Sequence, residues 1–77
     1  MSGGPSIGEF TAFAAGVMNV PAASLSADAA YGSVPEWDSV MHVRLVMEIA
    51  ERYGVEIPLE RVPEIRTLGD FWNFVKD

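Results

Sequence analysis

Apolar residues recur at helical spacing in three stretches of the chain, and the first stretch predicts a helix over residues 6–18. Ser6 and Glu9 have the S-x-x-E form of a capping box, which favours a helix that begins at this point. The apolar positions that follow are Ile7, Phe10, Phe13, Ala14, Val17 and Met18. We expect the two phenylalanines to lie in the core rather than to bind a ligand.

The second stretch predicts a helix over residues 39–53, with Asp38 as its N-cap and Gly54 just after its end. At about 100° per residue, one arc of this helix is apolar and the other is charged. The apolar arc holds Val43, Val46, Met47, Ala50 and Tyr53, widened by Leu45 and Ile49, and the charged arc holds Met41, Arg44, Glu48, Glu51 and Arg52. Glu48 and Arg52 are expected to form an i,i+4 pair in the favourable order.

The third stretch predicts a short helical segment over residues 59–63 and a last helix over residues 67–76. Pro63 cannot donate a helical hydrogen bond and restricts the residue before it, so the short segment is at most one turn. Thr67 is the expected N-cap of the last helix, with acidic Asp70 at its third position. Its core-facing stripe is Leu68, Phe71, Trp72 and Val75, and Phe74 is expected to cover an edge.

The connection between the first two helices, residues 19–38, is about twenty residues long and contains Pro21, Gly32 and Pro35. A structureless loop of that length would argue against the assignment. Five side chains can hold it against the core, namely Val20, Leu25, Tyr31, Val34 and Trp37. Its alanine-rich part is compatible with a short helical turn around residues 24–30.

The composition fits one small all-α domain over residues 1–77 with a modest core, because a chain of this size buries only roughly 60% of its unfolded surface. The apolar content of 49% argues against disorder. No cysteine is present, which excludes a disulfide framework and a thiolate metal site, and we expect no metal. No stretch has the pattern of a signal peptide or a membrane span, so a cytoplasmic monomer is expected.

The net charge of −6 disfavours nucleic acid as a partner, because that binding depends on Lys and Arg that neutralise phosphates. It also disfavours an anionic membrane surface. A basic protein partner fits this charge, and so does a soluble acidic protein with no charged partner.

The candidate chemistry lies at Ser39, the first residue of the second predicted helix. Its hydroxyl projects at the positive end of the helix dipole, where free N–H groups favour a phosphate. Asp38 is occupied as the cap, and no other base is placed beside the serine. The single histidine, His42, has no second ligand or nucleophile at helical spacing, so we expect a half-buried residue that caps the long loop. The sequence therefore predicts no catalytic residue and a serine that receives a group from another enzyme.

The sequence Asp38-Ser39-Val40, the helix after it and the tail Val55-Glu56-Ile57-Pro58 resemble an acyl or peptidyl carrier protein. In that family the serine of an Asp-Ser-Leu-type motif carries 4′-phosphopantetheine. Ser39 matches the attachment serine, Asp38 the aspartate before it and Val40 the apolar residue after it. Further matches are Tyr53 and Ile57-Pro58, which close the helix, and Thr67-Leu68 at the start of the last helix. The resemblance covers the chain well from about Trp37 and the first helix only loosely.

The resemblance implies a small four-helix bundle of acyl-carrier type, with a long first loop and a short or distorted third helix. It implies a non-catalytic phosphoprotein that holds acyl or aminoacyl groups as thioesters on 4′-phosphopantetheine at Ser39. The implied partners are a phosphopantetheinyl transferase, an acyl- or aminoacyl-loading enzyme, and ketosynthase, condensation or tailoring enzymes. They would dock on the second helix at Val40, Met41, Arg44, Met47, Glu48 and Glu51. Val40 and Met41 are expected to form an exposed pair beside the serine.

The chain departs from the family pattern in the charges of its second helix, and this departure bears on the type of pathway that it would serve. Many fatty-acid carriers have a nearly all-acidic second helix, whereas this one mixes Arg44 and Arg52 with glutamates. The Glu-Trp-Asp-Ser form favours a specialised pathway, such as polyketide, nonribosomal peptide or unusual-starter assembly, over a housekeeping fatty-acid role. The alternatives are an unmodified helical interaction module that binds through its 40–47 surface, and a carrier fold that has lost its arm.

Overall fold

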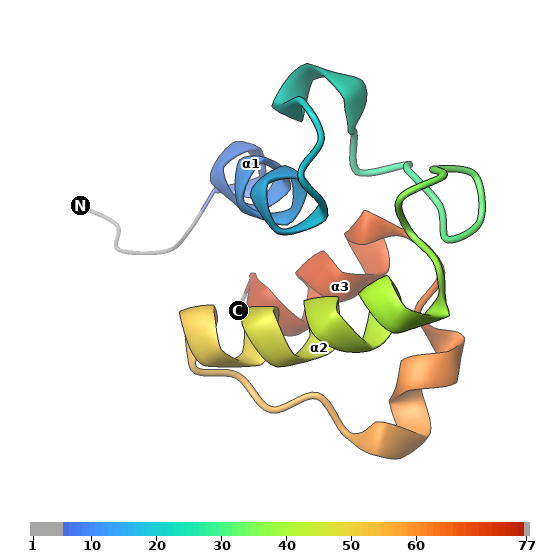
Figure 1. The fold of residues 1–77 in the computed structure, drawn as a ribbon. Coiled ribbons are helices and arrows are strands. Elements are labelled where there is room, and N and C mark those ends of the chain that lie inside the picture. The colour runs from blue at the N-terminus through green and yellow to red at the C-terminus, as the bar shows by residue number, and fades with distance from the viewer. Residues whose placement is uncertain (1–5, 77) are drawn as a thin grey trace.

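The regular structure of the chain is helical throughout the part that the computed structural model describes, residues 6–76. The elements are α1 (Ile7–Met18), η1 (Ala22–Ser24), α2 (Ser39–Tyr53), η2 (Leu59–Glu64) and α3 (Leu68–Val75), where η marks a 3₁₀ helix. Figure 1 shows α2 and α3 running across the view while α1 is seen nearly end-on against them. This is the predicted all-α bundle of acyl-carrier type, with η2 in the place of the short third helix. No helix within residues 6–76 combines the length and the apolar character needed to cross a bilayer.

Local sequence signals set the helix ends at the predicted positions. Ser6 is the N-cap of α1, and its hydroxyl and the Glu9 carboxylate each accept from the other residue's backbone N–H, so the predicted capping box is present. The helix α2 covers the same residues as the predicted one and ends at Gly54, which has a left-handed φ of 66°. Thr67 and Asp70 form a second reciprocal capping box at the start of α3.

The segment η2 is longer than the single turn that the sequence predicts, so that part of the prediction is wrong. It runs for six residues as a 3₁₀ helix with Pro63 inside it, so the prediction of a short or distorted helix is confirmed. Its end bonds are Arg61 N to Pro58 O at 2.9 Å and Ile65 N to Val62 O at 3.1 Å. Neither bond needs a proton on the proline nitrogen, so Pro63 is compatible with this tighter helix.

One core forms where α1, α2 and α3 meet. Phe10, Leu45, Ile49, Leu68 and Phe71 are fully buried in it. The other buried apolar residues are Ala14, Ala15, Met18, Leu25, Trp37, Ile57, Ile65 and Val75. Phe13, Trp72 and Phe74 pack around this core as partly buried residues, so the aromatic side chains of α1 and α3 are structural, as predicted.

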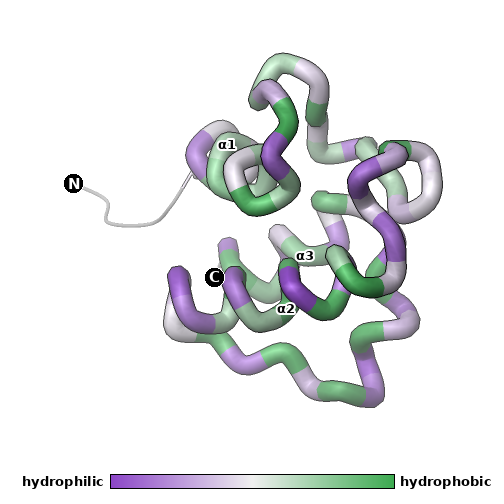
Figure 2. Tube along the Cα trace, viewed as in Figure 1, coloured by the Kyte–Doolittle hydropathy of each residue, from purple (hydrophilic) through white to green (hydrophobic). Residues whose placement is uncertain are grey.

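The core face of α2 is rotated from the predicted one. Leu45 and Ile49 are buried at its centre, whereas Val43 and Met47 are 55% and 63% exposed. Met41 packs against the core, so the prediction that it is exposed is wrong. Figure 2 shows hydrophobic residues spread between hydrophilic ones along α2. Because the apolar residues span so much of the circumference, periodicity alone could not select the buried arc.

The long connection between α1 and α2 is ordered by backbone hydrogen bonds to the start of α3. Tyr31 N donates to Arg66 O at 2.7 Å, Leu68 N to Ala29 O at 3.1 Å, and Gly69 N to Ala27 O at 2.9 Å. Its helical turn is η1, which begins earlier than the predicted turn around residues 24–30. Leu25 and Trp37 are buried as predicted, Val20 and Val34 are partly buried, and Tyr31 is largely exposed. The loop therefore reaches Ser39 along a fixed path.

Candidate functional site

The site begins at the N-terminus of α2, where Asp38 is the N-cap, as the sequence predicts. Asp38 has an extended backbone, with φ −103° and ψ −170°, and its Oδ1 accepts from Met41 N at 2.9 Å. Ser39 is the first residue of the helix and is exposed. The cap carboxylate is thus engaged with the backbone, and the serine side chain projects next to it into solvent.

The Ser39 hydroxyl differs from every other aliphatic hydroxyl in residues 6–76, because it makes no hydrogen bond there. Ser6 and Thr67 accept at helix caps. Ser24, Ser33 and Thr11 donate to backbone carbonyls, and Ser26 accepts from a backbone N–H. All of these hydroxyls are tied to the backbone, so Ser39 Oγ alone among them is available to a partner.

The backbone around Ser39 also offers unused donors. Within the described part of the chain, Met41 N is bonded to Asp38 Oδ1 and His42 N to Asp38 O, but Ser39 N and Val40 N have no acceptor. Free N–H groups and the helix dipole both favour a negative group at such a position. A phosphate linked to Ser39 Oγ would lie against these donors, so this end of α2 fits a phosphodiester.

Trp37 anchors the segment that leads into the site. It is only 1% exposed, and its ring lies 6.2 Å from that of Phe71, close to parallel. Its backbone N donates to Val34 O at 2.9 Å and closes the turn before the cap. Because this large buried side chain stands two positions before Ser39, the core itself fixes where the serine is presented.

His42 lies one turn after Ser39, and both of its ring nitrogens are occupied. Trp37 Nε1 donates to His42 Nδ1 at 3.0 Å, and His42 Nε2 lies 3.1 Å from Val62 O. An indole nitrogen can only donate, so Nδ1 is the acceptor and Nε2 carries the proton. The ring is half-buried, as predicted, and links the loop to η2. It therefore has no free nitrogen with which to act as a base for Ser39.

A cleft of about 480 Å³ opens beside the serine. It lies between the middle of the long loop, the start of α2 and the stretch from the end of η2 to the residues before α3. Its lining includes Tyr31, Ser39, His42, Val43, Ile65 and Arg66. The walls are mostly apolar, and Arg66 adds a cation that forms no ion pair within residues 6–76. The cleft could receive a flexible chain attached at Ser39.

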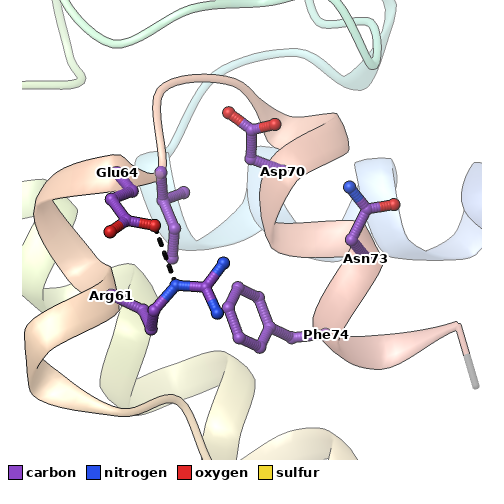
Figure 3. Close-up of a pocket in the computed structure, with 6 residues that line it drawn as sticks. Arg61, Glu64, Asp70, Asn73 and Phe74 are labelled. Carbon is purple, nitrogen blue, oxygen red and sulfur yellow. Dashed lines mark hydrogen bonds and ion pairs between the residues drawn. The ribbon is translucent and has the colours of Figure 1, made fainter.

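A second cavity of about 330 Å³ lies between η2 and α3 (Figure 3). Arg61, Glu64, Ile65, Asp70, Asn73 and Phe74 line it. Arg61 Nε bonds to Glu64 Oε1 at 2.8 Å, and its guanidinium lies 5.7 Å from the centre of the Phe74 ring. Asp70 Oδ2 accepts from the backbone N–H groups of Arg66 and Thr67. Glu64 is thus paired with Arg61 and Asp70 is bonded to the backbone, so these two carboxylates do not form a free pair for acid–base work.

The predicted contact surface on α2 is partly as expected. Val40 is 77% exposed, and Arg44, Met47 and Glu51 are exposed. Glu48 is half-buried and pairs with Arg44 at 3.8 Å rather than with Arg52. The guanidinium of Arg52 instead lies 5.7 Å from the ring centre of Phe13. Met41 does not belong to this exposed surface, because it is partly buried against the core.

Sequence reasoning missed three features around the serine. Val43 is exposed and lines the cleft, and Arg66 reaches the same cleft from a distant part of the chain. Trp37 is a predicted core residue, but its bond to His42 does not follow from the sequence pattern. Spacing i,i+3 from Val40 could have identified Val43, whereas the other two contacts depend on tertiary packing. Within residues 6–76, no group of three or more acidic, histidine or cysteine side chains is placed to hold a metal ion.

Comparison with known proteins was consistent with this geometry. The model of a family described as "Phosphopantetheine attachment site" matches residues 8–75. An acyl carrier protein of Tropheryma whipplei (strain Twist) is 36% identical over 52 residues, which cover 68% of this chain and 63% of that protein. The chain therefore spans less than two thirds of that relative. An acyl carrier protein of Helicobacter pylori (strain G27) is 35% identical over 60 residues, or 78% of this chain and 77% of that protein.

Proposed function

The chain belongs to the phosphopantetheine attachment site family, and on that premise we propose that it is a non-catalytic carrier whose 4′-phosphopantetheine is attached at Ser39. The observation that carries the proposal is the free, exposed hydroxyl of Ser39 at the first position of α2. When bound, the group supplies a terminal thiol that can hold an acyl or aminoacyl unit as a thioester. The described residues then act as one carrier domain that presents this unit to partner enzymes.

The residues around Ser39 support attachment at this position. The free N–H groups of Ser39 and Val40 would bind the phosphodiester oxygens, and Asp38 would hold the helix end in place through Met41 N. Attachment requires a new bond from Ser39 Oγ to the phosphorus of the pantetheine phosphate. The bond from that phosphorus to the phosphate oxygen of the adenosine bisphosphate part of coenzyme A breaks. The electron pair of this bond stays on that oxygen, and adenosine bisphosphate leaves.

We expect a base outside this chain to take the proton of the Ser39 hydroxyl. His42 uses both ring nitrogens within the fold, and Asp38 is engaged as the cap. A phosphopantetheinyl transferase would therefore supply the base. The chain contributes an accessible nucleophilic oxygen and a fixed helix end. It therefore acts in this reaction as the substrate and not as the enzyme.

We place the docking surface for partners on the exposed face of α2. Val40, Val43 and Met47 stand at i, i+3 and i+7 and form an apolar stripe that starts next to Ser39. Arg44, Glu48 and Glu51 flank it, so the charges around the stripe are mixed. Partners would include the transferase, a loading enzyme, and ketosynthase, condensation or tailoring enzymes.

The mixed charge of α2 supports a specialised pathway of the polyketide or nonribosomal peptide kind. Arg44 pairs with Glu48, and Arg52 lies against aromatic rings, so this helix does not present a uniformly acidic face. The names of the matched relatives instead favour a general acyl carrier as the second candidate. Incubation of the holo form with an aminoacyl-loading enzyme tests this choice, because an aminoacyl load would support a carrier of the nonribosomal peptide kind and would contradict a general acyl carrier.

The attachment is tested by incubation of the folded protein with coenzyme A and a phosphopantetheinyl transferase, followed by intact mass measurement. We expect the wild type to gain one phosphopantetheinyl group and Ser39→Ala to gain none. An unmodified interaction module or a carrier fold without an arm would give no gain in either protein.

A further inference from the structure

Two residues on either side of Ser39 are joined by a hydrogen bond that the carrier function does not itself explain. Trp37 Nε1 donates to His42 Nδ1 at 3.0 Å, and His42 Nε2 continues the connection to Val62 O at 3.1 Å. We call this chain of contacts the Trp37–His42–Val62 bridge. It connects the end of the long loop, the first turn of α2 and the 3₁₀ helix η2, and His42 also lines the cleft beside the serine.

We propose that His42 is a positioning residue, which through this bridge holds Ser39 in the orientation that the transferase requires. The inference rests on the proposed attachment at Ser39 and adds a residue to that site. Ser39 lies two positions after Trp37 and three before His42, so the two residues joined by the indole hydrogen bond flank it in the chain. We expect loss of this hydrogen bond to let the backbone between Trp37 and His42, and with it the Ser39 hydroxyl, leave its position.

The surroundings of His42 make the bridge rigid. The ring lies 5.2 Å from the Tyr31 ring and 5.4 Å from the Phe71 ring, measured between centres, and its plane is within 20° of that of Trp37 at 6.0 Å. Aromatic neighbours on these sides leave the imidazole little freedom to rotate. The indole N–H belongs to a residue that is only 1% exposed, so without His42 it would be buried with no acceptor.

Loss of positioning and loss of folding affect the transferase reaction differently. The docking stripe at Val40, Val43 and Met47 is exposed, whereas Trp37 is buried and His42 is half-buried. We therefore expect a misplaced Ser39 to leave binding unchanged and to slow the chemical step. A variant that is only less stable offers less folded substrate, which raises the apparent KM and leaves kcat unchanged. A change in kcat therefore indicates that His42 positions Ser39, whereas a change in the apparent KM alone indicates that His42 only stabilises the fold.

The test measures transferase kinetics on the full chain for the wild type, His42→Ala, His42→Gln and Val75→Ala. Val75 is the buried last residue of α3 and provides the stability control. Figure 1 shows α3 ending on the left of the view, whereas α2 begins on the right. We expect kcat for His42→Ala to fall about tenfold with KM within about twofold of the wild type. Glutamine carries one acceptor and one donor, so His42→Gln should recover most of kcat. Trp37→Phe removes the indole donor and keeps one aromatic ring, so it should repeat the fall in kcat of His42→Ala, with the lost core packing reported separately by KM and the unfolding free energy.

The bridge also has a spectroscopic signature that does not depend on the reaction. A long-range ¹⁵N–¹H spectrum of the wild type should show the Nε2–H form of the His42 ring and a slowly exchanging Trp37 indole proton. The Nδ1–H form would overturn the proposal, and so would a Trp37→Phe variant whose kcat equals that of the wild type. A wild type that is never modified would instead refute the attachment at Ser39.

Discussion

Asp38 Oδ1 lies 2.9 Å from Met41 N, and through this hydrogen bond the residue before Ser39 closes the first turn of α2. Oδ1 of this carboxylate is therefore held at the helix end, although Asp38 is the immediate neighbour of the serine. Because the cap satisfies Met41 N and leaves Ser39 N and Val40 N without a partner in the described part of the chain, it defines which donors face an incoming phosphate. The cap thus has a structural role and shapes the attachment site.

Removal of the cap should destabilise the whole domain. We expect Asp38→Ala to lower the free energy of unfolding by about 1 kcal/mol, the usual cost of losing an N-cap. Asp38→Asn keeps a side-chain acceptor and should lose much less. Urea unfolding followed by circular dichroism measures both, and equal stabilities for Asp38→Ala and the wild type would show that the bond to Met41 N contributes nothing.

The rotated core face of α2 predicts opposite behaviour for two apolar residues on one helix. Leu45 is fully buried and Met47 is 63% exposed. We expect Leu45→Ala to cost about 2–5 kcal/mol of unfolding free energy, because it leaves a cavity. Met47→Ala should change it by less than about 0.5 kcal/mol. Thermal unfolding of the two variants provides the measurement, and similar losses for both would contradict the observed face.

The exposed stripe predicts a loss of binding without a loss of stability. Val43→Ser should leave the melting temperature unchanged and raise the KM for the transferase by roughly threefold to tenfold, since interface side chains of this size contribute about 1 kcal/mol. Leu59→Ser is the matched control, because Leu59 is also exposed but lies on η2. Equal KM values for the two variants would place the docking surface elsewhere.

Substitution by alanine should change the stability in opposite directions at two glycines, Gly54 and Gly16. Gly54 ends α2 with a φ of 66°, which an alanine adopts only with strain, so Gly54→Ala should lower the stability by about 1 kcal/mol. Gly16 lies inside α1, and beyond its own helical backbone no atom lies within 4 Å of the place that an alanine Cβ would take. Gly16→Ala should therefore raise the stability by about 0.5–1 kcal/mol. Chemical unfolding of both variants tests the helix assignments, and a stabilising Gly54→Ala would contradict the left-handed cap.

The sequence predicted most of the fold because the helix ends are encoded locally. Ser6 with Glu9, Asp38 before Ser39, and Thr67 with Asp70 are cap signals that act within four residues. The orientation of α2 about its axis was predicted wrongly, because that choice is made by packing against α1 and α3. The length of η2 was also underestimated, since Pro63 forbids an α-helix but is tolerated in a 3₁₀ helix.

The candidate site was predictable only as far as it is contiguous in the sequence. Asp38 and Ser39 could be identified from the motif and the helix that follows it. The contact from His42 to Val62 spans twenty positions, and Arg66 reaches the cleft from just before α3. Such contacts depend on how the long loop and η2 pack, for which the amino-acid pattern gives no spacing rule.

The most direct test of the central claim is to locate the modified residue by fragment-ion mass spectrometry after reaction with coenzyme A and a phosphopantetheinyl transferase. Ser33→Ala serves as the control, because the Ser33 hydroxyl is bonded to Ala30 O while that of Ser39 is free. We predict one phosphopantetheinyl group on Ser39 in the wild type and in Ser33→Ala, and none in Ser39→Ala. A group found on any other residue, or a folded wild type that gains none, would contradict the account.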